Sequence, residues 1–471
     1  MGNLYIVMNT ILNINKNNFD LACSKQPKYK AVAELIEQAI LSGELSDQQK
    51  LPAQRWLADE LGVTHGTVTR GYDLLEKMNL VTAKLGAGTY VNLPSAAVKP
   101  FSIKKYDFAS SMQPMFGQQN LVKQALGELS EDIEAVEQLM TYAPQGVQKH
   151  KQVFVDWLAN KKINIKCDDI IFTQGAQQGI YTCLQILTNE HDYVMHEAMA
   201  YPGFFRAVDA TKINPLSVPI TSEGLDLMVL EGYCQQFKPK ALYITPNMQN
   251  PTNVQYSKKM LAALIQLSHQ YDFYLIEDDV NYCLPEHWRV PLQQQAPDRI
   301  FYLSSLSKYV AGGLRVAYAF TPKQYQHAFN LSIHSQCWMV STMTIEVACR
   351  FLTKENFKYN QTLLANEMRY RQNAFSHFAE KYGLEIRNGG LNVWLVLPPE
   401  INMNQFSGFC ASHNIKVRTA DLFCHLSSSQ QVVNGLRVSL GGFNTRSDFD
   451  AGLGKLEEAF ANFNNQQDIV I

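Results

Sequence analysis

Short apolar runs alternate with stretches of helical periodicity over residues 107–471. The runs DIIFT, ALYIT, FYLIE and IFYLS are strand-like, and longer helical patterns lie between them. Strands joined by helical crossovers pair in parallel, and both faces of such a sheet are covered by helices. The pattern therefore predicts an α/β fold with a mostly parallel sheet. From roughly residue 380, the runs NVWLVL and GLRVSL predict a smaller C-terminal α+β subdomain.

A chain of 471 residues exceeds what one hydrophobic core usually serves, and residues 26–92 have the pattern of a separate helical unit. The first helix is predicted within KYKAVAELIEQAILSGEL, with Gly43 as its stop. Five apolar residues recur there at helical spacing: Val32, Leu35, Ile36, Ala39 and Ile40. A second short helix is predicted in LPAQRWLADELGV, with Pro52 near its start and Gly62 at the following turn.

A third helix is predicted in THGTVTRGYDLLEKMNLV, and VTAKLGAGTYV after it reads as a two-stranded wing. Helix, glycine turn and helix form a helix-turn-helix, whose second helix enters the major groove of DNA. The side predicted to be buried carries Val68, Tyr72, Leu75 and Met78. The residues predicted to contact DNA are Arg55, Thr64, His65, Thr67, Arg70 and Lys84.

The charge of residues 26–92 allows an alternative without nucleic acid, a small helical bundle with a hairpin. Acidic residues slightly outnumber basic ones in this unit, and the formal net charge of the whole chain is -2. Diffuse attraction to DNA or to an anionic membrane is therefore excluded. Any contact with DNA has to come from a local patch.

The stretch LPAQRWLADELGVTHGTVTRGYDLLEKMNLVTAKLGAGTYV resembles the winged helix-turn-helix of the GntR superfamily of bacterial transcription regulators. The LPxxRxLAxxLGV run, the TV-R-Y segment and the GxGTYV wing occur in order. The resemblance implies that double-stranded promoter DNA is a partner and that the chain regulates transcription.

The segments around this unit carry little periodicity. Residues 1–25 are expected to form an N-terminal extension without a signal peptide, and residues 93–106 a polar linker. We expect no membrane span. The nine cysteines are scattered without a CxxC pair, which indicates reduced thiols in the cytoplasm and no metal site.

Polar residues follow four of the predicted strands, at the edge where α/β proteins bind ligands. A glycine turn with Ala176 and Gln177 follows DIIFT, PNMQNPTN follows ALYIT, and DDVNY follows FYLIE. The fourth stretch, FYLSSLSKYVAGGLRVAYAF, places Lys308 near hydroxyls and an arginine, which suit an aldehyde and a phosphate. Taken singly, these are a helix cap, a proline turn, a charged strand end and a hairpin with a surface lysine. Taken together, they favour a cofactor site, in which Asp278 fits a protonated pyridine nitrogen.

Residues 107–456 resemble the fold-type I aminotransferases that depend on pyridoxal 5'-phosphate (PLP), and with the GntR-like unit the chain is similar to MocR-type regulators. The resemblance implies a homodimer and an internal aldimine on Lys308. It implies that Tyr201 stacks on the pyridine ring, Asn250 bonds the ring oxygen and Arg437 binds a substrate carboxylate; the alternative for Arg437 is a surface ion pair. The implied phosphate ligands are Ala176, Gln177, Ser305, Ser307 and Arg315.

Three departures from the family pattern bear on activity. The usual tyrosine of the EDD segment is displaced to Tyr282, which stays in the candidate cofactor set, and Val280 and Asn281 occupy its places. NPTN replaces NPTG, and Met199 replaces a proline. These changes predict weak or absent transamination. The preferred interpretation is a regulator that senses PLP, an amine or an amino acid. The alternatives are an active aminotransferase with an accessory DNA-binding unit and a structural protein without a ligand.

Overall fold

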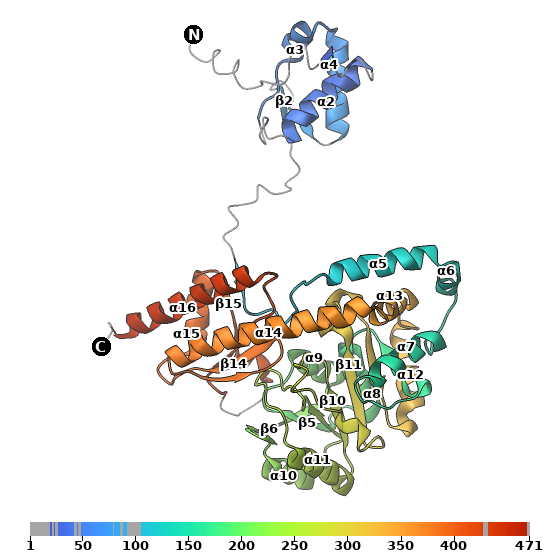
Figure 1. Cartoon of the computed structure of the whole chain (residues 1–471), viewed down its shortest axis with the longest axis vertical. Helices are drawn as coiled ribbons and strands as arrows, with labels where there is room; N and C mark the ends of the chain where they lie inside the picture. The colour runs from blue at the N-terminus through green and yellow to red at the C-terminus, as the bar shows by residue number, and fades with distance from the viewer. Residues whose placement is uncertain are drawn as a thin grey trace. The chain divides into compact units, whose positions relative to one another are not determined.

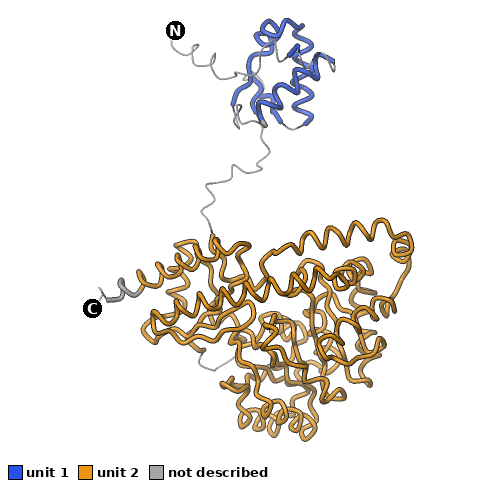
Figure 2. The backbone as a smooth tube through the Cα atoms, viewed as in Figure 1, with its two compact units in different colours: residues 1–103 blue, residues 104–471 orange. Residues whose placement is uncertain are grey.

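The chain divides into two compact units, residues 1–103 and residues 104–471 (Figure 2). The computed structural model describes residues 27–41, 49–78, 80–84, 88–91, 105–426 and 432–468, with residues 19, 20, 23 and 45. Most of the predicted extension, most of the predicted linker, Gly43 and the tip of the wing lie outside the described residues.

The first unit has the predicted order of helices and hairpin (Figure 1). The sequence α2 (Lys28–Leu41), α3 (Gln54–Leu61) and α4 (His65–Lys77) is followed by β1 (Val81–Lys84) and β2 (Gly88–Val91), which pair antiparallel. Gly62 ends α3 with a left-handed φ of 65°, which glycine adopts without steric cost. The hydroxyl of Thr64 then caps α4 by accepting the amide of Thr67 at 3.3 Å.

The core of the first unit confirms three of the four predicted buried positions of α4. Val68, Tyr72 and Leu75 are buried. The prediction for Met78 is wrong, because α4 ends at Lys77 and helical periodicity no longer sets the direction of the next side chain; Met78 is 44% exposed. The core also contains Phe19, which belongs to the segment expected as an extension.

Among the described residues of the second unit, seven strands form the main sheet in the order β4-β12-β11-β10-β9-β5-β6. β12 is antiparallel to both neighbours and the other pairs are parallel, which confirms a mostly parallel sheet. The strands are β4 (Ile171–Thr173), β5 (Tyr193–Glu197), β6 (Asn214–Val218), β9 (Ala241–Ile244), β10 (Tyr274–Asp278), β11 (Ile300–Ser305) and β12 (Ala317–Phe320).

Helices cover both faces of this sheet. Phe301 and Leu303 of β11 pack in one core, and Ile300 and Tyr302 pack on the opposite face, as the alternation of side chains along a strand requires. The first face is covered by α8 (Ala176–Leu187), α9 (Pro202–Thr211) and α12 (Lys323–Cys337). The second is covered by α7 (Gln148–Ala159), α10 (Leu227–Phe237), α11 (Lys258–Tyr271) and α13 (Thr342–Leu352).

The long helix α14 (Glu355–Lys381) leads to the predicted α+β subdomain (Figure 1). Its antiparallel sheet has the order β13-β14-β17-β16. The elements are β13 (Glu385–Asn388), β14 (Asn392–Val396), β16 (Arg418–Thr419), β17 (Gly435–Ser439), α15 (Met403–Ser412) and α16 (Arg446–Asp468). The strand β3 (Tyr106–Asp107) spans the predicted junction between the linker and the second domain. It pairs with β15 (Ile415–Lys416) of this subdomain.

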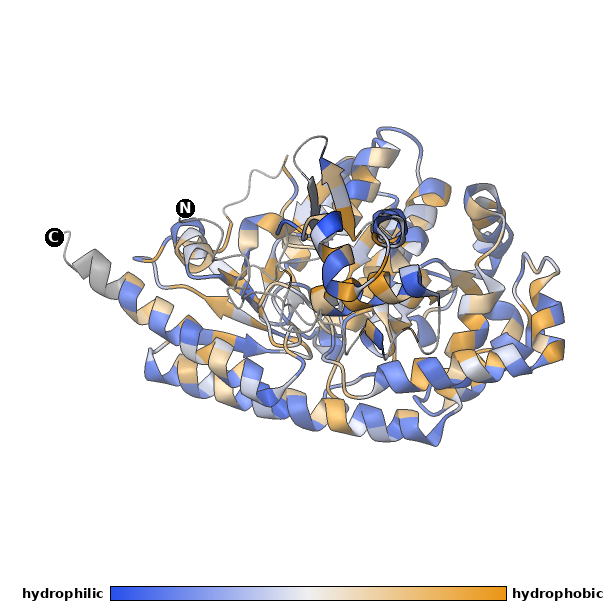
Figure 3. Cartoon of the chain, turned by 90° about the horizontal axis from the view of Figure 1, so that it is seen from above, coloured by the Kyte–Doolittle hydropathy of each residue, from blue (hydrophilic) through white to orange (hydrophobic). Residues whose placement is uncertain are grey.

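Two further helices, α5 (Gln118–Glu131) and α6 (Ile133–Leu139), pack against α13, and the short strands β7 (Ile220–Thr221) and β8 (Gly224–Leu225) form a separate hairpin. Figure 3 shows hydrophilic and hydrophobic residues alternating along the surface helices, as expected for helices with one buried side. No helix of the described residues has the length and apolarity needed to cross a membrane.

Candidate functional site

A cavity of about 500 Å³ opens at the ends of β10 and β11. It brings together ten of the predicted cofactor and effector residues, Ala176, Gln177, Tyr201, Asn250, Asp278, Ser305, Ser307, Lys308, Arg315 and Arg437. Its volume is that of a typical small-molecule site. We call it the cofactor cavity. Tyr282 lines a different cavity.

Lys308 lies in a single 3-10 turn (Leu306–Lys308) that follows β11 directly. The hairpin interpretation of this stretch is right in one respect, since β11 and β12 pair antiparallel. Lys308 is nevertheless only partly exposed and lines the cavity. Its Nζ donates to the carbonyl oxygen of Ser111. Burial, with a smaller contribution from the charge of Arg437, lowers the pKa of Lys308 to about 8. A lysine in this setting is a better nucleophile than a surface lysine.

Three kinds of anion-binding group meet near the start of α8. The hydroxyl of Ser305 donates to that of Ser307 at 2.9 Å, and both residues are buried. Arg315 packs on Gly175, where a Cβ atom would lie 2.0 Å from Nη2 of the guanidinium. Gly175 has a φ of 83° and precedes α8, whose first amides have no partner within the helix. Hydroxyls, a guanidinium and helix amides together suit a phosphate.

The one carboxylate that lines the cavity among the described residues belongs to Asp278, at the end of β10. The hydroxyl of Tyr243 donates to it at 2.6 Å, and the amide of Val280 at 3.2 Å. Burial raises the pKa of Asp278 to about 6, although these hydrogen bonds oppose the shift. A cationic ring nitrogen beside this carboxyl would favour its charged form.

Arg437 of β17 supplies a second binding point for an anion. Its Nη1 donates to Oδ1 of Asn250 at 3.0 Å and its Nη2 to the carbonyl of Ala109 at 3.0 Å. The residue is buried, and no carboxylate of the described residues pairs with it. The interpretation of Arg437 as a surface ion pair is therefore wrong. Its Nε is buried without a hydrogen-bond partner in the described part of the chain, so a carboxylate ligand would satisfy the guanidinium more fully.

Comparisons with known proteins agree with this arrangement. Residues 28–91 match the family described as bacterial regulatory proteins, gntR family, and residues 103–440 match aminotransferase class I and II. The chain is 26% identical over 451 residues to the uncharacterized HTH-type transcriptional regulator YdeF of Bacillus subtilis (strain 168), covering 91% of this chain and 94% of YdeF. This chain belongs to the MocR-type regulators of the GntR superfamily.

A second relative and two solved structures extend the comparison of this MocR-type regulator. YdcR of Escherichia coli (strain K12), another uncharacterized HTH-type transcriptional regulator, is 26% identical over 431 residues, covering 84% of this chain and 92% of YdcR. α-Aminoadipate aminotransferase LysN from Thermus thermophilus, complexed with N-(5'-phosphopyridoxyl)-L-leucine, has a TM-score of 0.68 at 22% identity and covers 79% of this chain and 96% of LysN. An archaeal alanine:glyoxylate aminotransferase has a TM-score of 0.70 at 17% identity, and the match covers 78% of this chain and 93% of that enzyme. These likenesses show the fold of the second unit.

The predicted DNA-facing residues of this MocR-type regulator occupy the helix-turn-helix and the hairpin. Arg55 of α3, Arg70 of α4 and Lys84 of β1 are exposed. His65 is exposed at the first position of α4. Thr64 is also exposed and Thr67 is partly buried, and their hydroxyls lie 2.8 Å apart, so the two threonines also fix the start of α4. The ammonium of Lys84 lies 4.6 Å from the ring centroid of Tyr90, which holds it on the hairpin.

The structure explains the NPTN departure of this MocR-type regulator. Asn253 stands where the aminotransferase pattern has glycine, and it has a left-handed φ of 57°. Asparagine tolerates this conformation better than most residues. Its side-chain amide donates to the carbonyls of Arg387 and Asn392, each at 3.0 Å. Asn253 therefore ties the loop after β9 to the α+β subdomain.

Replacing Asn253 with alanine is expected to lower the free energy of unfolding by about 2–4 kcal/mol. The change removes one buried and one partly buried hydrogen bond and places a Cβ-bearing residue without a polar side chain in the left-handed region. Replacement with glycine keeps the φ and should cost roughly half as much. Urea titration followed by circular dichroism checks the order. Equal losses for both variants would contradict the account of the φ angle.

The other departures of this MocR-type regulator lie in and around the cavity. Val280 and Asn281 line it, whereas Tyr282 is turned into a neighbouring core with Leu364 and Met368. Among the described residues, Tyr201 carries the one phenol that lines the cofactor cavity. Met199 is buried in the core of the α+β subdomain. Sequence reasoning missed two residues of the site. No pattern indicated Ser111, which contacts Lys308 from outside the sheet. Tyr243 lies within a strand, which indicated only a core residue, although its hydroxyl donates to Asp278.

Proposed function

We propose that this regulator binds double-stranded promoter DNA in the cytoplasm through α4 and the β1–β2 hairpin, and that its second unit holds PLP and senses PLP, an amine or an amino acid. The observation that carries the proposal is the donor set of the cofactor cavity. Lys308, Arg315 and Arg437 face one carboxylate, Asp278. This set matches an aldehyde, a phosphate, a carboxylate ligand and a cationic ring nitrogen.

Each end of the cavity has a separate task in this proposal. Ser305, Ser307, Arg315 and the start of α8 hold the phosphate, and Asp278 holds the ring nitrogen in its protonated form. When bound, PLP supplies an electron-withdrawing ring and an aldehyde that exchanges amines. Arg437 orients the carboxylate of an amino acid effector, and Asn250 keeps its guanidinium in place through the 3.0 Å hydrogen bond.

The capture of PLP by the protein should become faster as pH rises from 6 to 9. Only the neutral amine of Lys308 attacks an aldehyde, and the pKa of this amine is lowered to about 8. The rate should therefore level off above about pH 8, where most of the amine is neutral. Stopped-flow absorbance of cofactor-free protein mixed with PLP measures this profile. A rate that keeps rising tenfold per pH unit up to pH 10 would show an ordinary lysine.

An active aminotransferase is the second candidate, favoured by the ten predicted cofactor and effector residues that line one cavity. Sensing is favoured over turnover because Val280 and Asn281 line the place where the family pattern expects a tyrosine hydroxyl. The test incubates PLP-loaded protein with each common amino acid and an acceptor keto acid, and measures the new keto acid. We expect a transamination rate below about one turnover per minute. Turnover near 10 per second, which is typical of enzymes, would establish the alternative.

The apolar surface around α6 supports the proposal of a homodimer. It consists of Leu126, Ile133, Met140, Tyr142, Trp338 and Met343, which are between 41% and 79% exposed. We call this set the α5–α13 patch. Figure 1 shows α5 and α6 beside α13 at one edge of the unit, and the rings of Tyr142 and Trp338 lie 6.1 Å apart. An apolar patch of this kind marks an interaction surface.

Light scattering should report a dimer at micromolar concentration, and the double change Met140→Glu and Trp338→Glu should convert it to a monomer. Buried charges without partners oppose association. Met228→Glu is the matched control, because Met228 is 87% exposed on α10, away from the patch. A wild-type monomer would contradict the dimer. A dimer that survives the double change would place the interface elsewhere.

A further inference from the structure

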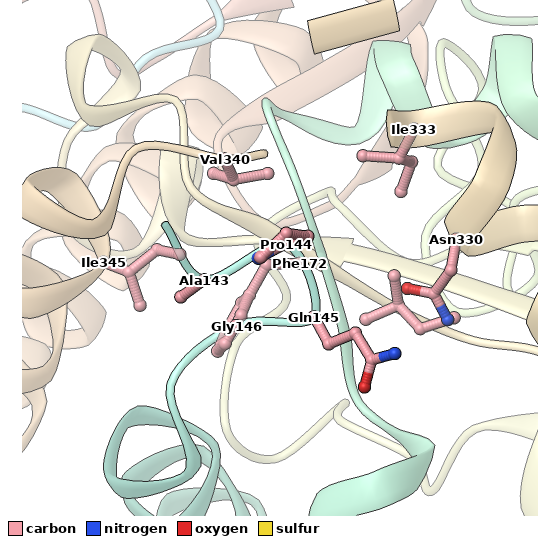
Figure 4. Close-up of a pocket in the computed structure, with 10 residues that line it drawn as sticks. Ala143, Pro144, Gln145, Gly146, Phe172, Asn330, Ile333, Val340 and Ile345 are labelled. Carbon is pink, nitrogen blue, oxygen red and sulfur yellow. The ribbon is translucent and has the colours of Figure 1, made fainter. Parts of the chain in front are cut away.

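A cavity beside β4 is too small for an organic ligand. Its volume is about 10 Å³, which is room for about one water molecule. Figure 4 shows residues that line it, which come from the segment 143–146, from β4, from α12, from the segment before α13 and from α13 itself. This cavity therefore carries no binding site for an effector.

A far larger cavity lies between α7, the start of α14 and the segment after β10. Its volume is about 830 Å³, within the range of small-molecule sites. None of its lining residues lines the cofactor cavity. We call it the α7–α14 cavity. Its apolar walls include Trp157, Trp288, Tyr309 and Phe357, so an occupant needs an apolar body.

The charge of the α7–α14 cavity favours an anion. Among the residues that the structure describes, three lysines line it, Lys161, Lys162 and Lys358, together with one carboxylate, that of Asp156. Asp156 is exposed and accepts a hydrogen bond from Gln152 at 2.8 Å. The basic residues therefore dominate the field within the cavity.

The surroundings of Lys161 indicate which chemical group a ligand of this cavity would carry. The Nζ of Lys161 lies 4.3 Å from the ring centroids of both Trp157 and Tyr309. No carboxylate in the described part of the chain forms an ion pair with it, although Asp279 attracts it from a greater distance. Burial lowers the pKa of Lys161 to about 8, so the ammonium stays mostly charged at neutral pH. Lys161 is partly exposed, so a ligand can reach it, and an ammonium that packs on two rings without an ionic partner gains most from a carboxylate ligand.

We propose that the α7–α14 cavity is a second ligand site, which binds an organic carboxylate with an aromatic or long aliphatic body. The carboxylate pairs with Lys161, and the body packs against Trp288 and Phe357. The cavity lies close to the cofactor cavity along the chain, because Tyr309 follows Lys308 and Tyr282 follows Asn281, and the rings of the two tyrosines lie 5.4 Å apart. The site itself does not require bound PLP.

The test titrates the full-length protein with 4-phenylbutyrate, with octanoate and with 4-phenyl-1-butanol as the uncharged control. Calorimetry gives affinities, and tryptophan fluorescence reports on Trp157 and Trp288. At least one acid should bind with a Kd below about 1 mM, at least tenfold more tightly than the alcohol. This comparison needs no variant. If neither acid binds, or if the alcohol binds as tightly as 4-phenylbutyrate, the proposal is overturned.

Variants separate this site from the cofactor cavity. Lys161→Met replaces the ammonium with an uncharged, unbranched side chain of similar length, and it should weaken binding of the acid at least tenfold. Lys149→Met is the matched control, because Lys149 is exposed on α7, which ends two residues before Lys161, and does not line the cavity. Arg437→Gln should leave binding of the acid unchanged. If only Arg437→Gln weakens it, the acid occupies the cofactor cavity and the second site does not exist.

Discussion

Replacing Lys308 with alanine is expected to abolish the visible absorbance that PLP acquires on binding this protein. Lys308 is the one lysine among the described residues that lines the cofactor cavity, and its lowered pKa suits reaction with an aldehyde. The loss should be complete, because no neighbouring side chain can replace the covalent link. Spectra from 300 to 500 nm after gel filtration measure it.

Arg315→Ala is a second variant, for which we expect a partial loss of PLP binding. A charge-assisted hydrogen bond to a phosphate contributes about 1.5–3 kcal/mol, so PLP retention should fall roughly ten- to hundredfold while the absorbance of the bound form remains. Borohydride reduction followed by peptide mass spectrometry identifies the modified residue. Cofactor fixed to a lysine other than Lys308, such as Lys161, would show that the assignment is wrong.

Replacing Arg70 with alanine is expected to abolish specific operator binding. Arg70 is exposed on α4, the helix that the helix-turn-helix arrangement presents to the major groove. A lost base contact costs about 1–3 kcal/mol at each half-site, and a dimer loses it twice. The PLP spectrum should remain intact, because Arg70 and the cofactor cavity belong to different compact units. Gel-shift titration on DNA upstream of the gene checks the affinity.

Lys30→Ala is the matched control for Arg70, because Lys30 is an exposed cation of the same unit on α2. It should change affinity little. Lys84→Ala should weaken binding to all sequences alike and reduce the salt slope by about one unit, as expected for a phosphate contact. If Arg70→Ala behaves like Lys84→Ala, then Arg70 contacts phosphate and reads no base.

The sequence predicted the fold well where periodicity and turn chemistry agreed. Short apolar runs between helical patterns identified β4, β9, β10 and β11, and the glycine turn at Gly62 located the helix-turn-helix. Met78 was misplaced because it lies one residue beyond the end of α4. Phe19 was missed because the residues around it show no sustained helical period of apolar residues, although Phe19 is packed in the core.

The cofactor cavity was predictable because polar residues at strand ends converge at one edge of a parallel sheet. Contacts that depend on tertiary packing were not predictable. Ser111 reaches Lys308 from a part of the chain that is 197 residues away in sequence. The burial of Arg437, and with it the exclusion of a surface ion pair, follows from the packing of β17 in the α+β subdomain. The α7–α14 cavity has no sequence signature, because α7, α14 and the segment after β10 meet only in the folded unit.

The measurement that tests the central claim most directly is the affinity of PLP-loaded protein for its promoter DNA in the presence of a panel of amines and amino acids. At least one compound that changes the PLP spectrum should shift the DNA affinity tenfold or more, a coupling of about 1.4 kcal/mol, and Lys308→Ala should remove the shift. If every such compound leaves DNA affinity unchanged while a keto acid accumulates, the chain is an aminotransferase with an accessory DNA-binding unit.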